Sequence, residues 1–477
     1  MYSSNTSPSP TRAAALISSL SPLKQPLLAD DRPKVSKFDV GEAAAPKGIS
    51  VAEAVYNVLN VYVGLGLLSK PYAIAEGGWL SVPTLAVLCA IANVTGKLIV
   101  RGFAKLPTSE QNYAGLGAKA FGAYGGALVS GVVTLEFFGA LMVVLIFVWK
   151  NALLLAPWYL PDAIISVETV AVVLTAFATP TVWALDFGAM TGIGLLGVVA
   201  SVLIVGVLLL VASCAALELA VSHTPPPPLT LPLVGSGFTV SVGIFILSLG
   251  GHAALPGVYA SMAEPHKFDQ MLDLSICAMC LIYVGVGLAG WLTYGWLKGE
   301  IVDVLVTTNM AKDASGGLVP LTLPGSVGER HMSLEATVMT LAVLAKSFTA
   351  ISPVTAVLAD LPERLLLGAP PLLDAADAQK RRHVFRQRAL RTLLLWLVAL
   401  CAYPCALSTH GLALVEAVTG AMCSMLASLA LPCACWVALY KDEVPAVQSV
   451  AALALAVIAA VAGAAFTAAD VVKLGTE

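Results

Sequence analysis

The sequence predicts an all-α polytopic membrane protein. Hydrophobic residues make up 58% of the 477 residues and charged residues only 12%, and the mean hydropathy is +0.87. Stretches without Asp, Glu, Lys or Arg are repeatedly long enough for a helix to cross the hydrocarbon of a bilayer. Six of them are residues 187–217, 224–263, 274–297, 392–415, 417–440 and 444–469. A single membrane anchor needs only one such stretch, so the chain must cross the membrane many times.

Windows of about 19 residues place eleven membrane spans in the sequence. Because this number is odd, the two termini should lie on opposite sides of the membrane. Most lysines and arginines outside the spans fall in segments on the same side of the membrane as the N-terminus. Because basic residues are enriched in cytoplasmic segments, this predicts a cytoplasmic N-terminus. The spans lie near residues 50–76, 79–100, 127–149, 164–184, 189–217, 237–262, 270–296, 332–359, 389–409, 411–438 and 445–468.

The rest of the composition argues against several classes of protein. Residues 1–47 are rich in serine, proline, alanine and charge, which is typical of a disordered tail. No basic tract interleaved with aromatic residues suggests a nucleic-acid partner. The nine cysteines fall within predicted apolar helices and lack the spacing of a metal site or a disulfide framework. No motif pairs a nucleophile with a base, so we expect neither an enzyme nor a bound metal.

The first predicted span is interrupted by glycine and proline. Gly64 and Gly66 weaken the helix near the middle of the membrane, and Pro71 lacks a backbone N–H group. Lipid offers no partner for the backbone groups that such an interruption frees. These groups must therefore face a hydrated cavity or other parts of the protein.

The sixth predicted span carries a matching interruption. Gly250 and Gly251 precede His252, and Pro256 follows. Two broken spans at corresponding places, five helices apart, are typical of transporters built from inverted repeats, which bind their substrate at the breaks. The alternative is that these glycines only allow neighbouring helices to pack closely.

The ends of broken helices suit an amino acid substrate. Free N–H groups at the start of a half-helix attract a carboxylate, and free carbonyl groups at the end of one attract an ammonium group. His252 can alternatively serve only as the hydrogen-bond partner of a freed carbonyl. The candidate substrate-binding residues are Asn60, Gly64, Gly66, Ser69, Phe245, Ser248, Gly250, Gly251 and His252.

Two ionisable residues lie deep within predicted spans and are candidates for coupling transport to an ion. Lys346 lies in the middle of the eighth span and Glu136 in the third. An ionisable side chain within a span is costly and is by default a functional hypothesis. Glu136 can accept a proton, bind a substrate amine or pair with Lys346, and both residues can alternatively be structural. We expect Glu416 to lie nearer the outer interface.

Four stretches in order along the chain resemble the amino acid/auxin permease (AAAP) family, especially its vacuolar-type amino acid transporter branch. The resemblance covers roughly residues 48–468. The four stretches are residues 60–79, residues 251–265 with Gly-His-Ala at their start, Lys346 with Ile-Ser-Pro-Val at 351–354, and Leu-Pro-Cys-Ala-Cys at 431–435.

The resemblance implies a fold of the LeuT/APC type, with five helices, five more in inverted orientation and one extra helix. The two repeats would occupy residues 48–217 and 237–438, and residues 439–477 would form the eleventh helix and a short tail. In that fold Lys346 would face the first helix where sodium-coupled relatives bind a cation. Those relatives also carry a polar side chain directly after the Gly-x-Gly of the first helix, where Leu67 stands here. A proton gradient is therefore expected rather than sodium.

The sequence as a whole predicts a secondary active transporter that moves amino acids by alternating access, as a proton-coupled symporter or antiporter. Its expected partners are an amino acid substrate and the lipid bilayer, and the branch resembled implies a vacuolar or other endomembrane. The alternative is a non-transporting or dual-role amino acid sensor that signals through its tail or residues 360–390. An ion channel is a third reading, for which the sequence offers no recognisable filter.

Overall fold

The structure is a computed structural model. It describes residues 48–62, 64–159, 166–183, 187–222, 230–297, 301, 306–307, 334–368, 377–408 and 410–476. The predicted N-terminal tail, residues 1–47, lies outside the described residues.

The described residues form helices and no sheet, with a single isolated bridge between Ile49 and Met262, so the predicted all-α class is confirmed. The α-helices are α2 (Val51–Tyr62), α3 (Lys70–Gly77), α4 (Ser81–Gly102), α5 (Tyr113–Tyr159), α6 (Val167–Ala178), α7 (Phe187–Ser222), α8 (Phe238–Ser248), α9 (Leu255–Ser261), α10 (Phe268–Gly290), α12 (Leu334–Leu367), α13 (Asp377–Leu407), α14 (Gly411–Val418), α15 (Leu431–Tyr440) and α16 (Ala446–Thr476). Short 3-10 segments η1 (Leu65–Leu67) and η6 (His252–Ala254) and the π-helix η9 (Thr419–Ala430) join some of them.

Nine helical segments of the described chain are long and apolar enough to cross a membrane. The first predicted span is not among these nine because it consists of two short helices, α2 and α3. The fourth predicted span corresponds to the shorter apolar helix Val167–Trp183. Each of the other nine predicted spans overlaps one of the nine candidate segments, and the total of eleven stays a prediction.

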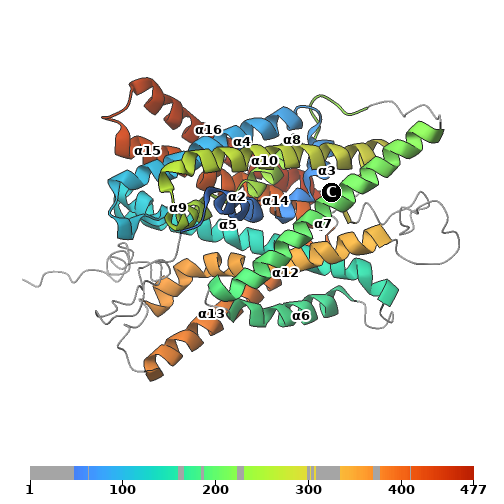
Figure 1. The fold of residues 1–477 in the computed structure, drawn as a ribbon, viewed down its shortest axis with the longest axis horizontal. Coiled ribbons are helices and arrows are strands. Elements are labelled where there is room, and N and C mark those ends of the chain that lie inside the picture. The colour runs from blue at the N-terminus through green and yellow to red at the C-terminus, as the bar shows by residue number, and fades with distance from the viewer. Residues whose placement is uncertain are drawn as a thin grey trace, which may run out of the picture.

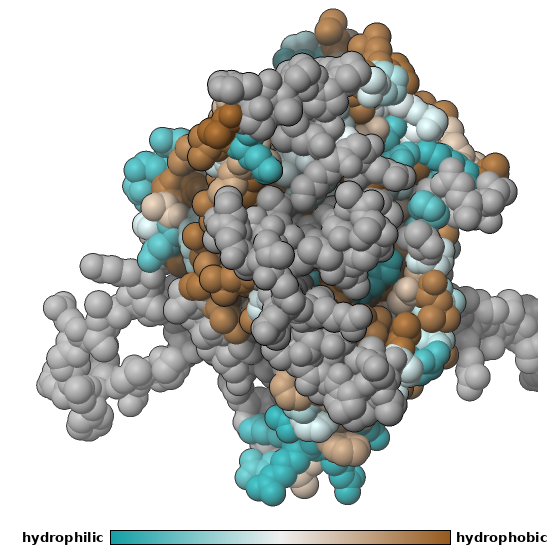
Figure 2. Space-filling view, turned by 90° about the vertical axis from the view of Figure 1, so that its right-hand side faces the viewer, coloured by the Kyte–Doolittle hydropathy of each residue, from teal (hydrophilic) through white to brown (hydrophobic). Residues whose placement is uncertain are grey.

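The outer faces of the bundle are apolar. Phe177, Leu210, Leu400 and Val461 are each more than half exposed, as are many other large hydrophobic side chains. Figure 2 shows hydrophobic residues at several places around the perimeter of one end of the molecule. Such a surface suits contact with lipid, whereas a soluble monomer rarely exposes large contiguous apolar patches.

The long helices run along the molecule, and the short segments α2, α3 and α14 lie among them (Figure 1). Helix α8 packs against α3, α14 and η9, while α10 packs against α2, α3 and α4. Helix α12 packs against α5 and α7. Gly243 of α8 and Gly420 of η9 allow this inner contact, because a Cβ atom at Gly420 would lie 1.8 Å from the carbonyl oxygen of Gly243.

The two broken spans are hydrogen-bonded to each other reciprocally at their ends. The segment that precedes α2 pairs with the end of α9: Ile49 N–H donates to the Ser261 carbonyl (2.9 Å). The segment that precedes α8 pairs with the end of α3: Gly235 N–H donates to the Gly77 carbonyl (2.9 Å). Two repeats of opposite orientation would produce this reciprocal pattern.

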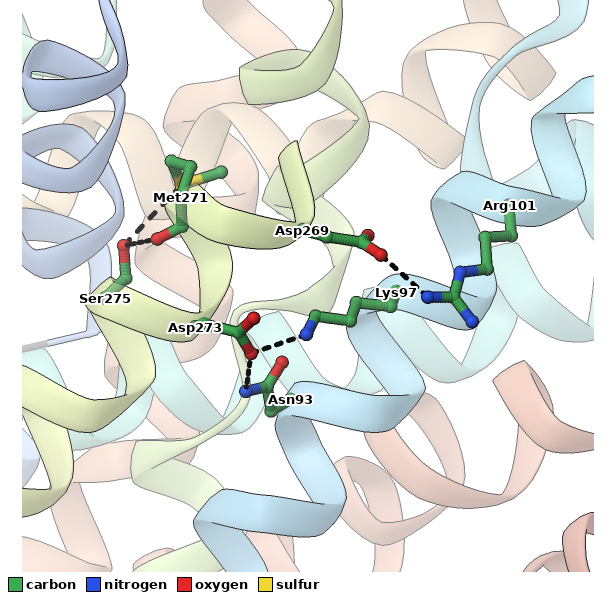
Figure 3. Close-up of polar contacts among 7 residues, drawn as sticks. All are labelled: Asn93, Lys97, Arg101, Asp269, Met271, Asp273 and Ser275. Atoms are coloured by element: carbon green, nitrogen blue, oxygen red, sulfur yellow. Dashed lines mark hydrogen bonds and ion pairs between the residues drawn. The ribbon is translucent and has the colours of Figure 1, made fainter. Parts of the chain in front are cut away.

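Helices α4 and α10 are joined by two ion pairs spaced one helical turn apart (Figure 3). The Lys97 ammonium lies 2.5 Å from the Asp273 carboxylate, which also accepts a hydrogen bond from Asn93 (2.6 Å). The Arg101 guanidinium lies 2.7 Å from the carboxylate of Asp269. These pairs are partly exposed, so they contribute modestly to stability and mainly fix how the two helices align.

Candidate substrate site at the two helix breaks

The first span breaks where the sequence predicts. Helix α2 ends at Tyr62, one 3-10 turn follows, and α3 begins at Lys70. Pro71 lies in the first turn of α3, where its missing N–H group costs no helical hydrogen bond. The chain therefore presents the C-terminal end of one short helix and the N-terminal end of another within a single span.

The sixth span breaks in the same manner. Helix α8 ends at Ser248, and α9 begins at Leu255 with Pro256 in its first turn. Between them Gly250 and Gly251 carry the chain into the 3-10 turn η6. The predicted pair of broken helices is thus present.

The two breaks are in direct contact. A Cβ atom at Gly66 would lie 2.3 Å from the hydroxyl oxygen of Ser248, and one at Gly251 would lie 2.5 Å from the ring of Tyr62. Both distances are shorter than real Cβ contacts allow. Glycine at these two positions is therefore a requirement of the close approach between the two spans.

The hydroxyl of Tyr283 on α10 links the ends of α2 and α8. It lies 2.5 Å from the carbonyl oxygen of Tyr62 and 3.1 Å from that of Ser248. These carbonyls stand at the C-terminal ends of the two half-helices, where helical partners run out. In this arrangement a side chain of the protein meets both of them.

Buried polar groups converge on Gly250 and Gly251. The Oε1 atom of Glu136, a residue of α5, would lie 2.5 Å from a Cβ at Gly250, and the Ser424 hydroxyl of η9 would lie 3.1 Å from it. Oε1 of Glu136 and the hydroxyl of Tyr62 have no hydrogen-bond partner within bonding distance among the described residues, although the Ser424 hydroxyl interacts with the Glu136 carboxylate. Burying a carboxylate oxygen without a hydrogen bond costs free energy, and a positively charged ligand would offset that cost.

Three other predicted site residues have defined contacts. The Ser69 hydroxyl donates to Oε1 of Glu416 (2.8 Å), and the Phe245 ring is fully buried beside the Lys70 ammonium. The His252 ring faces α4, with Nε2 3.1 Å from the Ala92 carbonyl.

Gly64 and Asn60 are the remaining predicted substrate-binding residues. Gly64 lies in the first break, where its N–H group donates to the Tyr62 carbonyl (2.7 Å). Asn60 belongs to α2, and its side chain lies outside the described part of the structure.

The two predicted coupling residues lie at different helix contacts. Lys346 is 5% exposed on α12, and its side chain lies close to Gly197 of α7. Glu136 is 3% exposed and lies at the break in the sixth span. Helix α12, which carries Lys346, also packs against η1 in the break of the first span.

The sequence reasoning missed three residues of this region. Lys70 is fully buried, and its position within a predicted span was a usable signal. We expected Glu416 near the outer interface, but it is 1% exposed and bonded to Ser69 in the protein interior. Tyr283 had no signal, because one tyrosine in an apolar helix looks the same whether or not it reaches a helix break.

Comparison with known proteins agrees with this architecture. Residues 47–474 match the family described as "Transmembrane amino acid transporter protein". Amino acid transporter AVT1D of Arabidopsis thaliana is 25% identical over 441 residues, which cover 91% of this chain and 71% of the relative. AVT1B of the same plant is 27% identical over 420 residues, covering 86% and 69%. The vesicular inhibitory amino acid transporter of Macaca fascicularis is 22% identical and covers 57% and 53%.

Two solved structures share the fold. MhsT in complex with L-phenylalanine superposes with a TM-score of 0.55 at 12% identity, covering 90% of this chain and all of that one. A Na+-coupled sialic acid symporter superposes with a TM-score of 0.52 at 13% identity, covering 98% and 95%. Both are transporters with the LeuT fold. The family match spans nearly the whole chain, and the protein therefore belongs to the transmembrane amino acid transporter family, the amino acid/auxin permeases.

Proposed function

We propose that this protein is a secondary active transporter that moves amino acids across a membrane by alternating access, driven by a proton gradient. Family membership supports amino acid transport, and the two broken spans supply a site of the right kind for it. The two repeats, residues 48–217 and 237–438, would rock relative to each other around the breaks, with residues 439–477 outside the repeats.

One observation carries the proposal: the buried Glu136 carboxylate meets the break in the sixth span beside the unpartnered hydroxyl of Tyr62. The ammonium group of an amino acid would give this carboxylate a charged partner. The substrate carboxylate would lie at the N-terminal end of α3, where the helix dipole favours negative charge. The glycines of the two breaks, Gly64, Gly66, Gly250 and Gly251, would then contact the substrate.

Proton coupling rests on the buried ionisable side chains. Glu136 and Lys346 lie in the interior of the bundle, and either can change its charge by exchanging one proton. A sodium ion after Gly66 would find the apolar side chain of Leu67. We therefore propose protons, and not sodium, as the coupling ion.

The setting is a membrane, and we propose a vacuolar or other endomembrane with the N-terminus in the cytoplasm. The resemblance to the vacuolar-type branch of the family, given above, supports an endomembrane location. The excess of basic residues in segments on the same side of the membrane as the N-terminus supports this orientation.

Reconstituted protein tests the proposal. Proteoliposomes should accumulate labelled neutral amino acids when a pH gradient is imposed, and a protonophore should abolish the accumulation. Liposomes without protein, and proteoliposomes at equal pH, are the controls. Uptake that ignores the gradient would remove proton coupling, while substrate binding without any flux would favour the amino acid sensor.

A further inference from the structure

Lys70 is a buried charge that the proposed transport mechanism does not use. It is the first residue of α3, and none of its surface is exposed. Its ammonium group reaches across to α8, where it donates a hydrogen bond to the hydroxyl of Ser248 and lies 3.5 Å from the carbonyl oxygen of Ile244. A lysine buried to this degree needs a specific environment that favours its charge.

The surroundings of this ammonium group are those of a cation site. Its nitrogen lies 4.7 Å from the ring centre of Tyr283 and 5.4 Å from that of Phe245, so two aromatic faces meet it. Both oxygen ligands come from the last turn of α8, the negative end of that helix dipole. The C-terminal ends of half-helices are where transporters of this architecture coordinate free cations.

A counter-ion lies next to the site. The hydroxyl of Ser69, the neighbour of Lys70, donates to Oε1 of Glu416 (2.8 Å), and the charge of Glu416 acts on the Lys70 ammonium. The other titratable groups that face Lys70 are the thiol of Cys89 on α4 and the phenol of Tyr283 on α10. Glu416 is thus a buried acidic residue whose charge acts on this buried base.

We propose that the end of α8 forms a binding site for a monovalent cation, that the Lys70 ammonium fills it as a tethered cation, and that this contact holds α3 against α8. The contacts that define the cation site do not depend on the proposed function. The role of this site in the transport cycle rests on the proposed function.

Chemical rescue tests the site directly. Lys70→Ala removes the ammonium and leaves space for n-propylammonium, a small ion that resembles the missing part of the side chain. The melting temperature of the purified variant in detergent should rise with n-propylammonium chloride, compared with choline chloride at the same ionic strength, because a ligand that binds only the folded state stabilises it. Wild-type protein, whose site is filled, should show no such difference. Stabilisation of Lys70→Ala by sodium would also support a cation site.

A double-variant cycle provides a second test that needs no added ligand. Lys70→Met and Glu416→Gln should each lower the melting temperature, because each leaves one buried charge without its counter-charge. The double variant should melt above the less stable single variant, since neither charge remains. Ser275→Ala is the matched control, because among the described residues the hydroxyl of this buried serine bonds to Met271 of its own helix α10 and to no other helix (Figure 3).

The outcomes separate this inference from the proposed function. Additive losses in the cycle, together with a Lys70→Ala protein that no cation stabilises, would overturn the tethered cation. If Lys70→Ala does not fold, the cycle with Lys70→Met decides the question alone. Wild-type proteoliposomes that move no amino acid would refute the proposed function, and the melting experiments would still measure the cation site.

Discussion

Tyr62 and Gly251 face each other across the two helix breaks, so that any side chain at position 251 would meet the tyrosine ring at 2.5 Å. The ring belongs to the last turn of α2, and Gly251 leads into η6. This contact ties the geometry of one break to the other. A change at either residue must therefore act on the shared site.

Gly251→Ala should impair transport strongly. The added methyl group would push the Tyr62 ring away from the break and separate the two spans. We expect exchange of labelled amino acid at equal pH to fall by at least about tenfold, which corresponds to about 1.4 kcal/mol. Gly257→Ala in α9 is the control, because a Cβ there meets nothing within 4 Å. Equal exchange by the two variants would show that the close approach is unimportant.

Glu136→Gln should abolish accumulation driven by a pH gradient. The amide keeps the shape of the side chain but can neither attract the substrate ammonium as strongly nor exchange a proton. We expect substrate affinity, measured by displacement of labelled ligand, to fall by at least about tenfold, as loss of a charged hydrogen bond predicts. The exposed Glu218→Gln variant in α7 should behave like wild type. Normal affinity in Glu136→Gln would remove the carboxylate from the site.

The positions of the two breaks could be predicted from the sequence, because glycine and proline act on the backbone locally. The partners at the breaks could not. Ser69 and Glu416 are 347 positions apart, and only the packing of α14 beside α8 brings Glu416 to the first break. The hydropathy profile placed Glu416 near the end of a span. Such a profile gives the position of a residue along a helix, but it does not show which neighbouring helix the residue contacts.

The same distinction explains the different outcomes for Glu136 and His252. Both are polar residues within apolar spans, and the sequence favoured both as site residues. The structure turns Glu136 toward Gly250, whereas the His252 ring lies against α4, 3.0 Å from the Thr95 hydroxyl. The direction of a side chain at a helix break depends on the local turn, which hydropathy and residue spacing do not specify.

Lys346→Met should separate coupling from substrate exchange. The variant keeps most of the side-chain volume against Gly197 but removes the charge. We expect accumulation under a pH gradient to be lost while exchange at equal pH continues, because Lys346 lies near Gly197 of α7, whereas Glu136 lies at Gly250 in the break. Lys119→Met, at an exposed position of α5, serves as the control. Retention of gradient-driven accumulation by Lys346→Met would assign coupling to other residues.

The ion pair between Glu76 and Lys473 should stabilise the end of the bundle where α3 and α16 meet. Their charged groups lie 2.7 Å apart, and both side chains are partly exposed, at 29% and 23%. A second contact, from the Thr239 hydroxyl to Asp470 (2.5 Å), links α16 to α8 in the same region.

Glu76→Gln and Lys473→Met should each lower the melting temperature slightly, and the coupling energy of the double-variant cycle should be about 0.5–1 kcal/mol, as for other partly exposed pairs. High salt should reduce that coupling, because it screens exposed charges. Lys441→Met, at an exposed position between α15 and α16, controls for the loss of a positive charge. A coupling energy near zero at low salt would mean that α16 is held by the Thr239–Asp470 contact and by its packing against α8, α14, α15 and η9 without help from the ion pair.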